Sequence, residues 1–181
     1  MKYHFIRARR KKSLTNYTKR FKLLSSSLPR IIVRKTNKGI IIQAAAYSPK
    51  GDIIYTSAHS RELIPFGWKP SSNIPTAYLT GLLFASKLKK KGASDEYILD
   101  IGLYKPIKNS VLFAAAKGVA DNKINLRNSI EFDESRLSGE HISSYAKSLP
   151  KDSHNQFSKT LEFAKNITDI FNTVKNKLLE K

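Results

Sequence analysis

Three short runs of β-branched and other apolar residues predict strands over 30–36, 39–47 and 53–59. Two turn segments separate these runs. Residues 37–39, Asn-Lys-Gly, tolerate positive φ, and residues 48–52 place Pro and Gly where turns commonly have them. Because both connections are short, we expect the three strands to form an antiparallel meander.

The apolar pattern then changes to helical spacing. Ser72 or Asn73 is a suitable N-cap for a helix expected over 75–91, which carries its basic residues in the last turn. A strand is predicted over 96–103. An Ala-rich helix is predicted over 111–121.

This βββαβα order predicts an α/β fold. The three-stranded antiparallel meander is extended to a mixed sheet by the following βαβα segment and is packed with helices. Within the second helix, Gly118 is expected to let the backbone approach the sheet closely. A last short strand is expected over 127–132. Trp68 is expected to close the core, with stacking on a base as the alternative.

The remaining residues predict two C-terminal helices, over 134–147 and 153–181. Three parts of the chain are therefore expected. They are a basic arm over 1–29, for which the charge described next predicts RNA binding, an α/β core domain over 30–132 and a C-terminal helical extension over 133–181.

Charge is distributed very unevenly between these parts. Residues 1–51 contain 14 Lys and Arg and no Asp or Glu, so they hold +14 of the formal net charge of +19, and the first carboxylate is Asp52. Self-repulsion on this scale is tolerable where a polyanion supplies the countercharge. We therefore expect a nucleic-acid partner and a mobile arm that folds on binding, partly as a helix over 15–24.

The arm and the first hairpin supply the candidate RNA contacts. Cations neutralise phosphates, flat rings stack on unpaired bases, and Thr and Asn donate hydrogen bonds to phosphate or 2′-OH groups. A solvated tail that only aids solubility, and a charged edge that discourages strand pairing, remain open alternatives. His141 is a further candidate, with a plain helix surface as its alternative. The hairpin and arm candidates are Arg7, Arg9, Arg10, Lys11, Lys12, Tyr17, Lys19, Arg20, Lys22, Arg30, Arg34, Lys35, Thr36, Asn37 and Lys38.

Other classes of function find less support. The chain has no Cys, which excludes disulfides, Cys-based zinc sites and thiol catalysis. Its apolar stretches fall well short of the ~18–20 residues of a membrane span, and no apolar h-region follows the N-terminal charges. We expect a soluble protein with no membrane partner and no small-molecule substrate.

Two enzymatic alternatives are weak. A hydrolase that uses Ser57, His59 and Asp100 lacks a Gly-x-Ser-x-Gly elbow. A metal nuclease would need Asp52, Asp100 and Asp121 to converge, although they fall at a turn, a strand and a helix end. A protein-interaction module that uses its C-terminal helices is a further alternative. We expect no catalytic residue, no metal site and no cofactor.

Seven collinear segments, which span nearly the whole chain, are typical of one known family. The chain resembles large-subunit ribosomal protein eighteen, the family that binds 5S ribosomal RNA, in its archaeal and eukaryotic branch. The segments are Pro-Arg-Ile-Ile-Val-Arg-Lys (29–35), Ser-Ala-His-Ser-Arg-Glu-Leu (57–63), Gly-Trp-Lys (67–69), Pro-Thr-Ala-Tyr-Leu-Thr-Gly-Leu-Leu (75–83), Ile-Leu-Asp-Ile-Gly-Leu (98–103), Phe-Ala-Ala (113–115) with Lys-Gly (117–118), and Asp-Glu-Ser-Arg-Leu-Ser-Gly-Glu-His-Ile (133–142).

The resemblance implies a structural, non-catalytic protein of the cytoplasmic large ribosomal subunit. Such a protein seats 5S rRNA in the central protuberance and touches 23S rRNA and neighbouring ribosomal proteins. Positions 7–12, 17–22 and 30–38 match the segments that hold 5S rRNA, and positions 139–141 resemble a segment that faces 23S rRNA. The resemblance also adds the loop residues Ser57, His59, Ser60 and Arg61 to the candidate RNA contacts.

Overall fold

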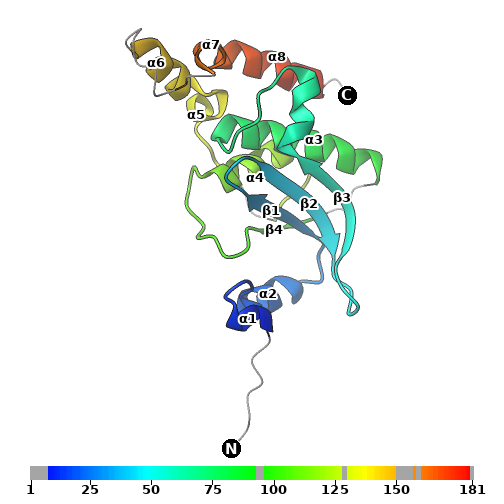
Figure 1. The fold of residues 1–181 in the computed structure, drawn as a ribbon. Coiled ribbons are helices and arrows are strands. Elements are labelled where there is room, and N and C mark those ends of the chain that lie inside the picture. Colours follow the sequence, from blue (N-terminus) through cyan, green and yellow to red (C-terminus); the bar gives the residue numbers. More distant parts are fainter. Residues whose placement is uncertain (1–7, 93–95, 128–129, 150–156, 158–159, 180–181) are drawn as a thin grey trace, which may run out of the picture.

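The structure, a computed structural model, describes residues 8–92, 96–127, 130–149, 157 and 160–179. Its centre is a four-stranded sheet in the order β3-β2-β1-β4 (Figure 1). The strands are β1 (Arg30–Lys35), β2 (Ile40–Ala46), β3 (Ile53–His59) and β4 (Ile98–Asp100). The first three are antiparallel neighbours and β4 runs parallel to β1, which confirms the predicted mixed α/β sheet.

Two helices cover one face of this sheet. They are α3 (Ile74–Lys90) and α4 (Val111–Asp121), and the short 3-10 helix η1 (Ser60–Phe66) leads from β3 towards α3. Asn73 starts α3 as predicted, because its side chain accepts a hydrogen bond from the Thr76 amide at 3.0 Å. The chain thus crosses from β3 through α3 to the far edge strand β4.

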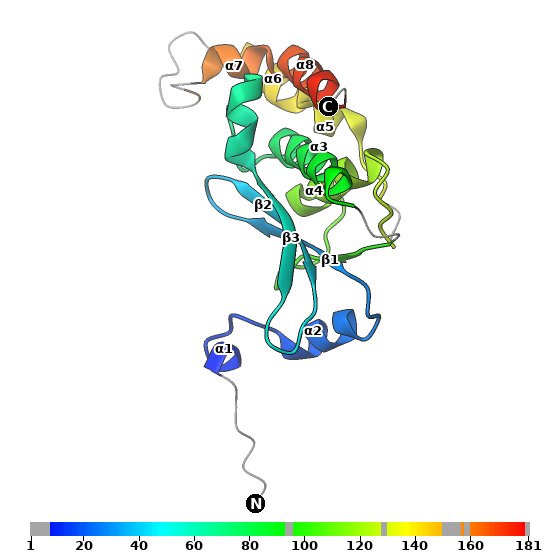
Figure 2. The ribbon, with the colours of Figure 1, turned by 90° about the vertical axis from the view of Figure 1, so that its right-hand side faces the viewer.

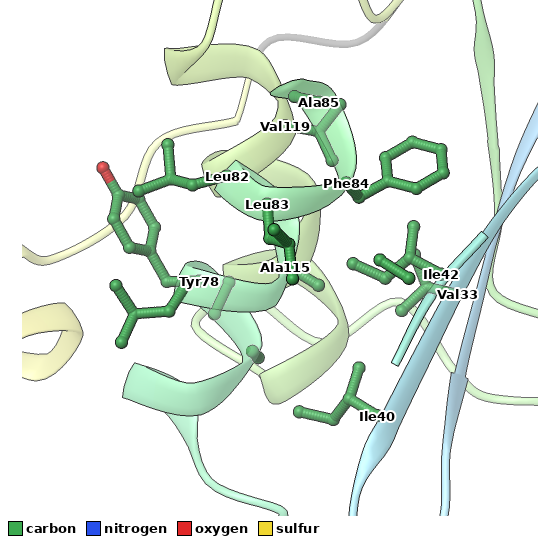
Figure 3. Packing of buried hydrophobic residues seen from close by; sticks show 14 of the residues in the cluster. Val33, Ile40, Ile42, Tyr78, Leu82, Leu83, Phe84, Ala85, Ala115 and Val119 are labelled. Atoms are coloured by element: carbon green, nitrogen blue, oxygen red, sulfur yellow. The ribbon is translucent and has the colours of Figure 1, made fainter. Parts of the chain in front are cut away.

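Alternation along the strands selects the residues that form the core. Val33, Ile40 and Ile42 are fully buried and point towards the helices, where Phe84 of α3 lies against them (Figure 3). Trp68 is also buried, and its indole N–H donates to the Thr76 hydroxyl at 2.9 Å. The prediction that Trp68 closes the core is therefore confirmed.

Two glycines allow α3 and α4 to cross at close range. A Cβ placed on Gly118 would lie 2.2 Å from the carbonyl oxygen of Tyr78, and a Cβ placed on Gly81 would lie 2.2 Å from that of Ala115. Gly118 therefore brings α4 against α3, and the expectation that it faces the sheet is wrong. Helix packing at this distance leaves no room for a methyl group.

The described residues of the C-terminal part form four helices. They are α5 (Glu134–Ser138), α6 (Glu140–Ser148), α7 (Leu161–Lys165) and α8 (Ile167–Leu179). Gly139 divides the helix predicted over 134–147, because its φ of +85° is a left-handed conformation that ends α5. Part of the helix predicted over 153–181 lies outside the described residues.

Helix α8 is packed into the main core. Its Phe171 ring lies 5.6 Å from the Tyr78 ring and 6.3 Å from the Trp68 ring, centroid to centroid. Its buried residues belong to the same hydrophobic cluster as the strand residues. The C-terminal helices and the α/β core therefore share one hydrophobic core.

One predicted strand is shorter than expected, and a second, whose residues 128–129 lie outside the described residues, is not found in the remainder of its segment. The segment predicted over 96–103 keeps only β4, because Gly102 turns the chain with a φ of +66°. Near the segment predicted over 127–132, the described residues contain a single bridge, between Tyr97 and Leu126, and no strand. In the part of the chain that the structure describes, no helix is long and apolar enough to cross a lipid bilayer.

The α3–α4 contact generates a stability prediction. Replacing Gly with Ala inside a helix gains about 1 kcal/mol of helix propensity. Gly118→Ala would therefore stabilise α4 if α4 did not touch α3. Here we expect a net loss of about 2 kcal/mol in the free energy of unfolding, because the methyl group meets backbone. Urea denaturation measures this change. Asn172→Ala on the exposed side of α8 is the control, expected within about 0.5 kcal/mol of wild type, and a more stable Gly118→Ala variant would contradict the contact.

Candidate nucleic-acid interface

The arm contains two helices, α1 (Ala8–Lys11) and α2 (Tyr17–Leu24). Asn16 begins α2 by accepting a hydrogen bond from the Lys19 amide at 3.0 Å. A helix therefore lies within the segment predicted over 15–24, and folding of the arm on binding stays a prediction. It lies on the other side of the sheet from α3 and α4 (Figures 1 and 2).

Two cations of α2 attach the arm to the rest of the chain. The Lys19 ammonium donates to the carbonyl oxygens of Gly102 at 2.8 Å and Tyr104 at 3.3 Å. The Arg20 guanidinium lies 2.9 Å from both carboxylate oxygens of Asp52, in the turn between β2 and β3. Both side chains were predicted RNA contacts, and the structure uses them within the protein.

Asp52 also reaches a second arginine, Arg30, at the start of β1. The Arg30 side chain is 1% exposed, and its guanidinium lies 2.7 Å from Asp52 and 3.3 Å from Asp100. Asp100 in turn lies 3.2 Å from Arg34, which is 39% exposed. Arg30 and Arg34 are four residues apart on β1 and share the strand face away from α3, and a charge buried there requires paired carboxylates.

The structure removes some predicted contacts from the surface. Arg30 is enclosed by its ion pairs, so the expectation that its side chain faces RNA is wrong. Ser60 is fully buried, and its hydroxyl accepts a hydrogen bond from the Ile40 amide at 3.1 Å. Thr36 is exposed, but its hydroxyl donates to the Gly39 carbonyl and accepts from the Gly39 amide, which closes the β1–β2 turn.

The other predicted contacts fall into separate groups. Because β2 runs for seven residues, its two turns lie roughly 20 Å apart. One end holds the arm and the β2–β3 turn. The other end brings the β1–β2 turn beside His59, whose ring would lie 3.2 Å from a Cβ on Gly39. His141 lies apart from both, on α6.

Most of these remaining side chains are exposed. Tyr17 is half-buried, His59 is half-buried and caps η1 through its Nδ1, and Arg7 lies outside the described residues. The exposed predicted contacts are Arg9, Arg10, Lys11, Lys12, Lys22, Lys35, Asn37, Lys38, Ser57, Arg61 and His141.

A cleft of about 1230 Å³ separates the arm from the β2–β3 turn. Cations from both sides line it, among them Arg9, Arg10 and Lys50. Flat rings line it as well, and Phe21 is 73% exposed and Tyr47 57% exposed. The sequence prediction omitted Lys50 and Tyr47, although both belong to the same acid-free stretch. Exposed rings among cations are suited to unpaired bases and phosphates.

The pKa of His141 is lowered. Partial burial is the main cause, the charge of Arg136 adds to it, and Asp133 opposes it. A lowered pKa keeps the ring neutral at pH 7, so His141 contributes a hydrogen-bonding ring rather than a positive charge.

The candidate residues of the two enzymatic alternatives are not arranged as either kind of active site requires. His59 and Asp100 lie on β3 and β4, which are the two opposite edges of the sheet. Asp100 is paired with arginines, and Asp121 is paired with Lys117 and accepts the Tyr78 hydroxyl. Within the described residues, no three His, Asp or Glu side chains are grouped to hold a metal ion.

The folded core and its basic, ring-lined cleft are features of a structural nucleic-acid-binding protein. Comparison with known proteins shows the family within this class to which the chain belongs. A family model described as "Ribosomal large subunit proteins 60S L5, and 50S L18" matches residues 1–98. The chain is also 42% identical, over 189 aligned positions, to large ribosomal subunit protein uL18 of Desulfurococcus amylolyticus, and the alignment covers 99% of the chain and 95% of that protein. The chain belongs to this family of large-subunit ribosomal proteins.

Family membership confirms several of the predictions. The chain is a structural, RNA-binding protein of the large ribosomal subunit, acts in translation in the cytoplasm, and is not an enzyme. Its partners are ribosomal RNA and other ribosomal proteins.

The ion pairs of Asp52 generate the second prediction. Asp52→Asn removes the charge that neutralises buried Arg30 and attaches α2, so we expect a loss of about 2 kcal/mol in the free energy of unfolding. Relative to wild type, amide hydrogen exchange should also speed up more in α2 than in α3. The control is Glu131→Gln, an exposed carboxylate, which should change neither measurement. Unchanged stability together with unchanged α2 exchange would show that Asp52 does not attach the arm.

Proposed function

We propose that this chain binds 5S ribosomal RNA and helps attach it to 23S ribosomal RNA in the central protuberance. The observation that carries the proposal is the cleft between α2 and the β2–β3 turn, where cations surround exposed rings. No Asp or Glu occurs before Asp52, and Asp52 is itself paired with Arg20 and Arg30. An RNA strand in this cleft therefore meets no unpaired carboxylate from the first 52 residues.

Each part of the chain has its own role in this proposal. The arm, residues 1–29, supplies charge and rings. The core, residues 30–132, holds the arm in place through Lys19 and Arg20 and presents Lys35, Asn37 and Lys38 at the other end of β2. The extension, residues 133–181, presents the neutral ring of His141 towards 23S rRNA or a neighbouring protein.

The proposed contacts follow from exposure in the structure. We keep the exposed cations of the arm and of the β1–β2 turn, and we add Phe21, Tyr47 and Lys50. We also keep Tyr17, Arg34, Asn37, Ser57, His59, Arg61 and His141. Lys19 and Arg20 act by positioning α2. Arg30 and Ser60 act through the fold.

Salt dependence of 5S rRNA binding tests the proposal. Arg10→Gln/Lys11→Gln/Lys12→Gln removes three exposed cations of the arm. We expect the slope of log K against log salt to become shallower by about 2, since each lost phosphate contact changes it by ~0.7–0.9. The measurement is filter binding to 5S rRNA over a range of potassium chloride concentrations.

A matched variant controls for the loss of net charge. Lys147→Gln/Lys165→Gln/Lys177→Gln removes the same charge from exposed positions of the C-terminal helices and should leave the 5S slope nearly unchanged. Equal slopes for wild type and the arm variant would contradict binding by the arm.

A further inference from the structure

A second basic cleft lies on the edge of the sheet, between β3 and the end of α3. Its volume is about 510 Å³, and it is lined by Ile54, Tyr55, Thr56, Ser57, Lys87, Lys90 and Lys91. Of these residues, only Ser57 was among the predicted RNA contacts. The three lysines belong to the last turns of α3, which the core places beside β3.

A β-bulge lies at the wall of this cleft, and its extra residue is aromatic. Thr56 pairs with Ala44 and Ile54 pairs with Ala45, so Tyr55 is the extra residue of β3. A bulge turns the side chain of its extra residue away from the regular alternation. Tyr55 is 45% exposed and is one of the residues that line the cleft together with the lysines. A flat exposed ring beside cations is suited to a stacked base.

The lysines reach across to the strand. Lys91 donates to the Tyr55 carbonyl at 2.9 Å, and Lys87 donates to the Ser57 carbonyl at 3.2 Å and pairs with Glu62. An ammonium has three N–H donors, so each of these lysines keeps at least one donor for a phosphate. Lys90 is exposed beside them.

The same hydrogen bonds argue against a protein strand as the occupant. A strand that adds to the β3 edge needs free backbone carbonyls, whereas those of Tyr55 and Ser57 are already bonded to lysines. Three cations against the single carboxylate of Glu62 favour an anionic partner. The ring and the cations together fit a nucleotide.

We propose that the β3–α3 cleft is a second RNA-binding site, where Lys87, Lys90 and Lys91 bind phosphate and Tyr55 stacks on an unpaired base. This inference rests on the proposed function, because it takes ribosomal RNA as the ligand. The β2–β3 hairpin connects the two sites, since the arm cleft includes residues 47–51 and the second cleft begins at Ile54. One hairpin therefore presents RNA-binding surfaces in two places.

The test measures salt-dependent binding of the full chain to 5S rRNA and to 23S rRNA separately. Lys90→Gln/Lys91→Gln should make the slope of log K against log salt shallower by about 1.4 for the RNA that occupies the cleft. Tyr55→Ala should weaken binding of that RNA about tenfold or more, and Tyr55→Phe, which keeps the ring, should stay within about twofold. The matched control is Lys165→Gln/Lys177→Gln, which should change neither slope.

Ultraviolet cross-linking of the wild-type chain to the same RNAs gives a readout that does not depend on variant folding. A cross-linked nucleotide on Tyr55, in the tryptic peptide that spans residues 51–61, is expected. Unchanged slopes for both RNAs, an equal change in the control, or the absence of this cross-link would overturn the second site. These outcomes can be distinguished from a failure of the proposed function. In that case the wild-type chain would not bind 5S rRNA at all. Loss of binding to 23S rRNA alone would support the cleft and assign it to that RNA.

Discussion

The neutralisation of one buried guanidinium organises the basic half of this protein. Arg30 lies inside the fold between Asp52 and Asp100, and each of these carboxylates also pairs with a second arginine. A buried charge without a partner costs several kcal/mol, so β1, β4 and the β2–β3 turn must meet at this point. Asp52 extends the same network to Arg20, which brings the arm onto the sheet. The first carboxylate after 51 acid-free residues is therefore the one that places the arm.

The opposite face of the sheet depends on packing. Gly81 and Gly118 let α3 and α4 touch through their backbones, and α3 then presents Phe84 to the strands and Tyr78 to α8. This central helix joins the sheet to the C-terminal helices in a single hydrophobic cluster. It also ends beside β3, which puts its last lysines on the sheet edge. The scaffold and the second basic cleft thus depend on the same helix.

Local patterns in the sequence predicted the elements well. The three antiparallel strands, the helix that begins after Asn73 and the helix over 111–121 all follow from signals within a few residues. Gly102 and Gly139 ended elements earlier than predicted, and the errors about contacts came from residues with two possible partners. Gly118 allows close approach to a sheet or to a helix, and Arg30 and Ser60 have the same chemistry at a surface as in a buried network. Tyr55 gave no local signal, because a bulge depends on the register of the neighbouring strand.

The sequence by itself determined the class of partner, the order of the elements and the family resemblance. Charge content, turn residues and helix caps act over short distances, so they can be identified from neighbouring residues in the sequence. Only the tertiary structure decided which cations face solvent. Burial and ion pairing depend on residues far apart in sequence: Arg20, Arg30, Asp52 and Asp100 meet because β1 lies between β2 and β4. The division of the acid-free segment into side chains that position the arm and side chains open to RNA is therefore a property of the fold.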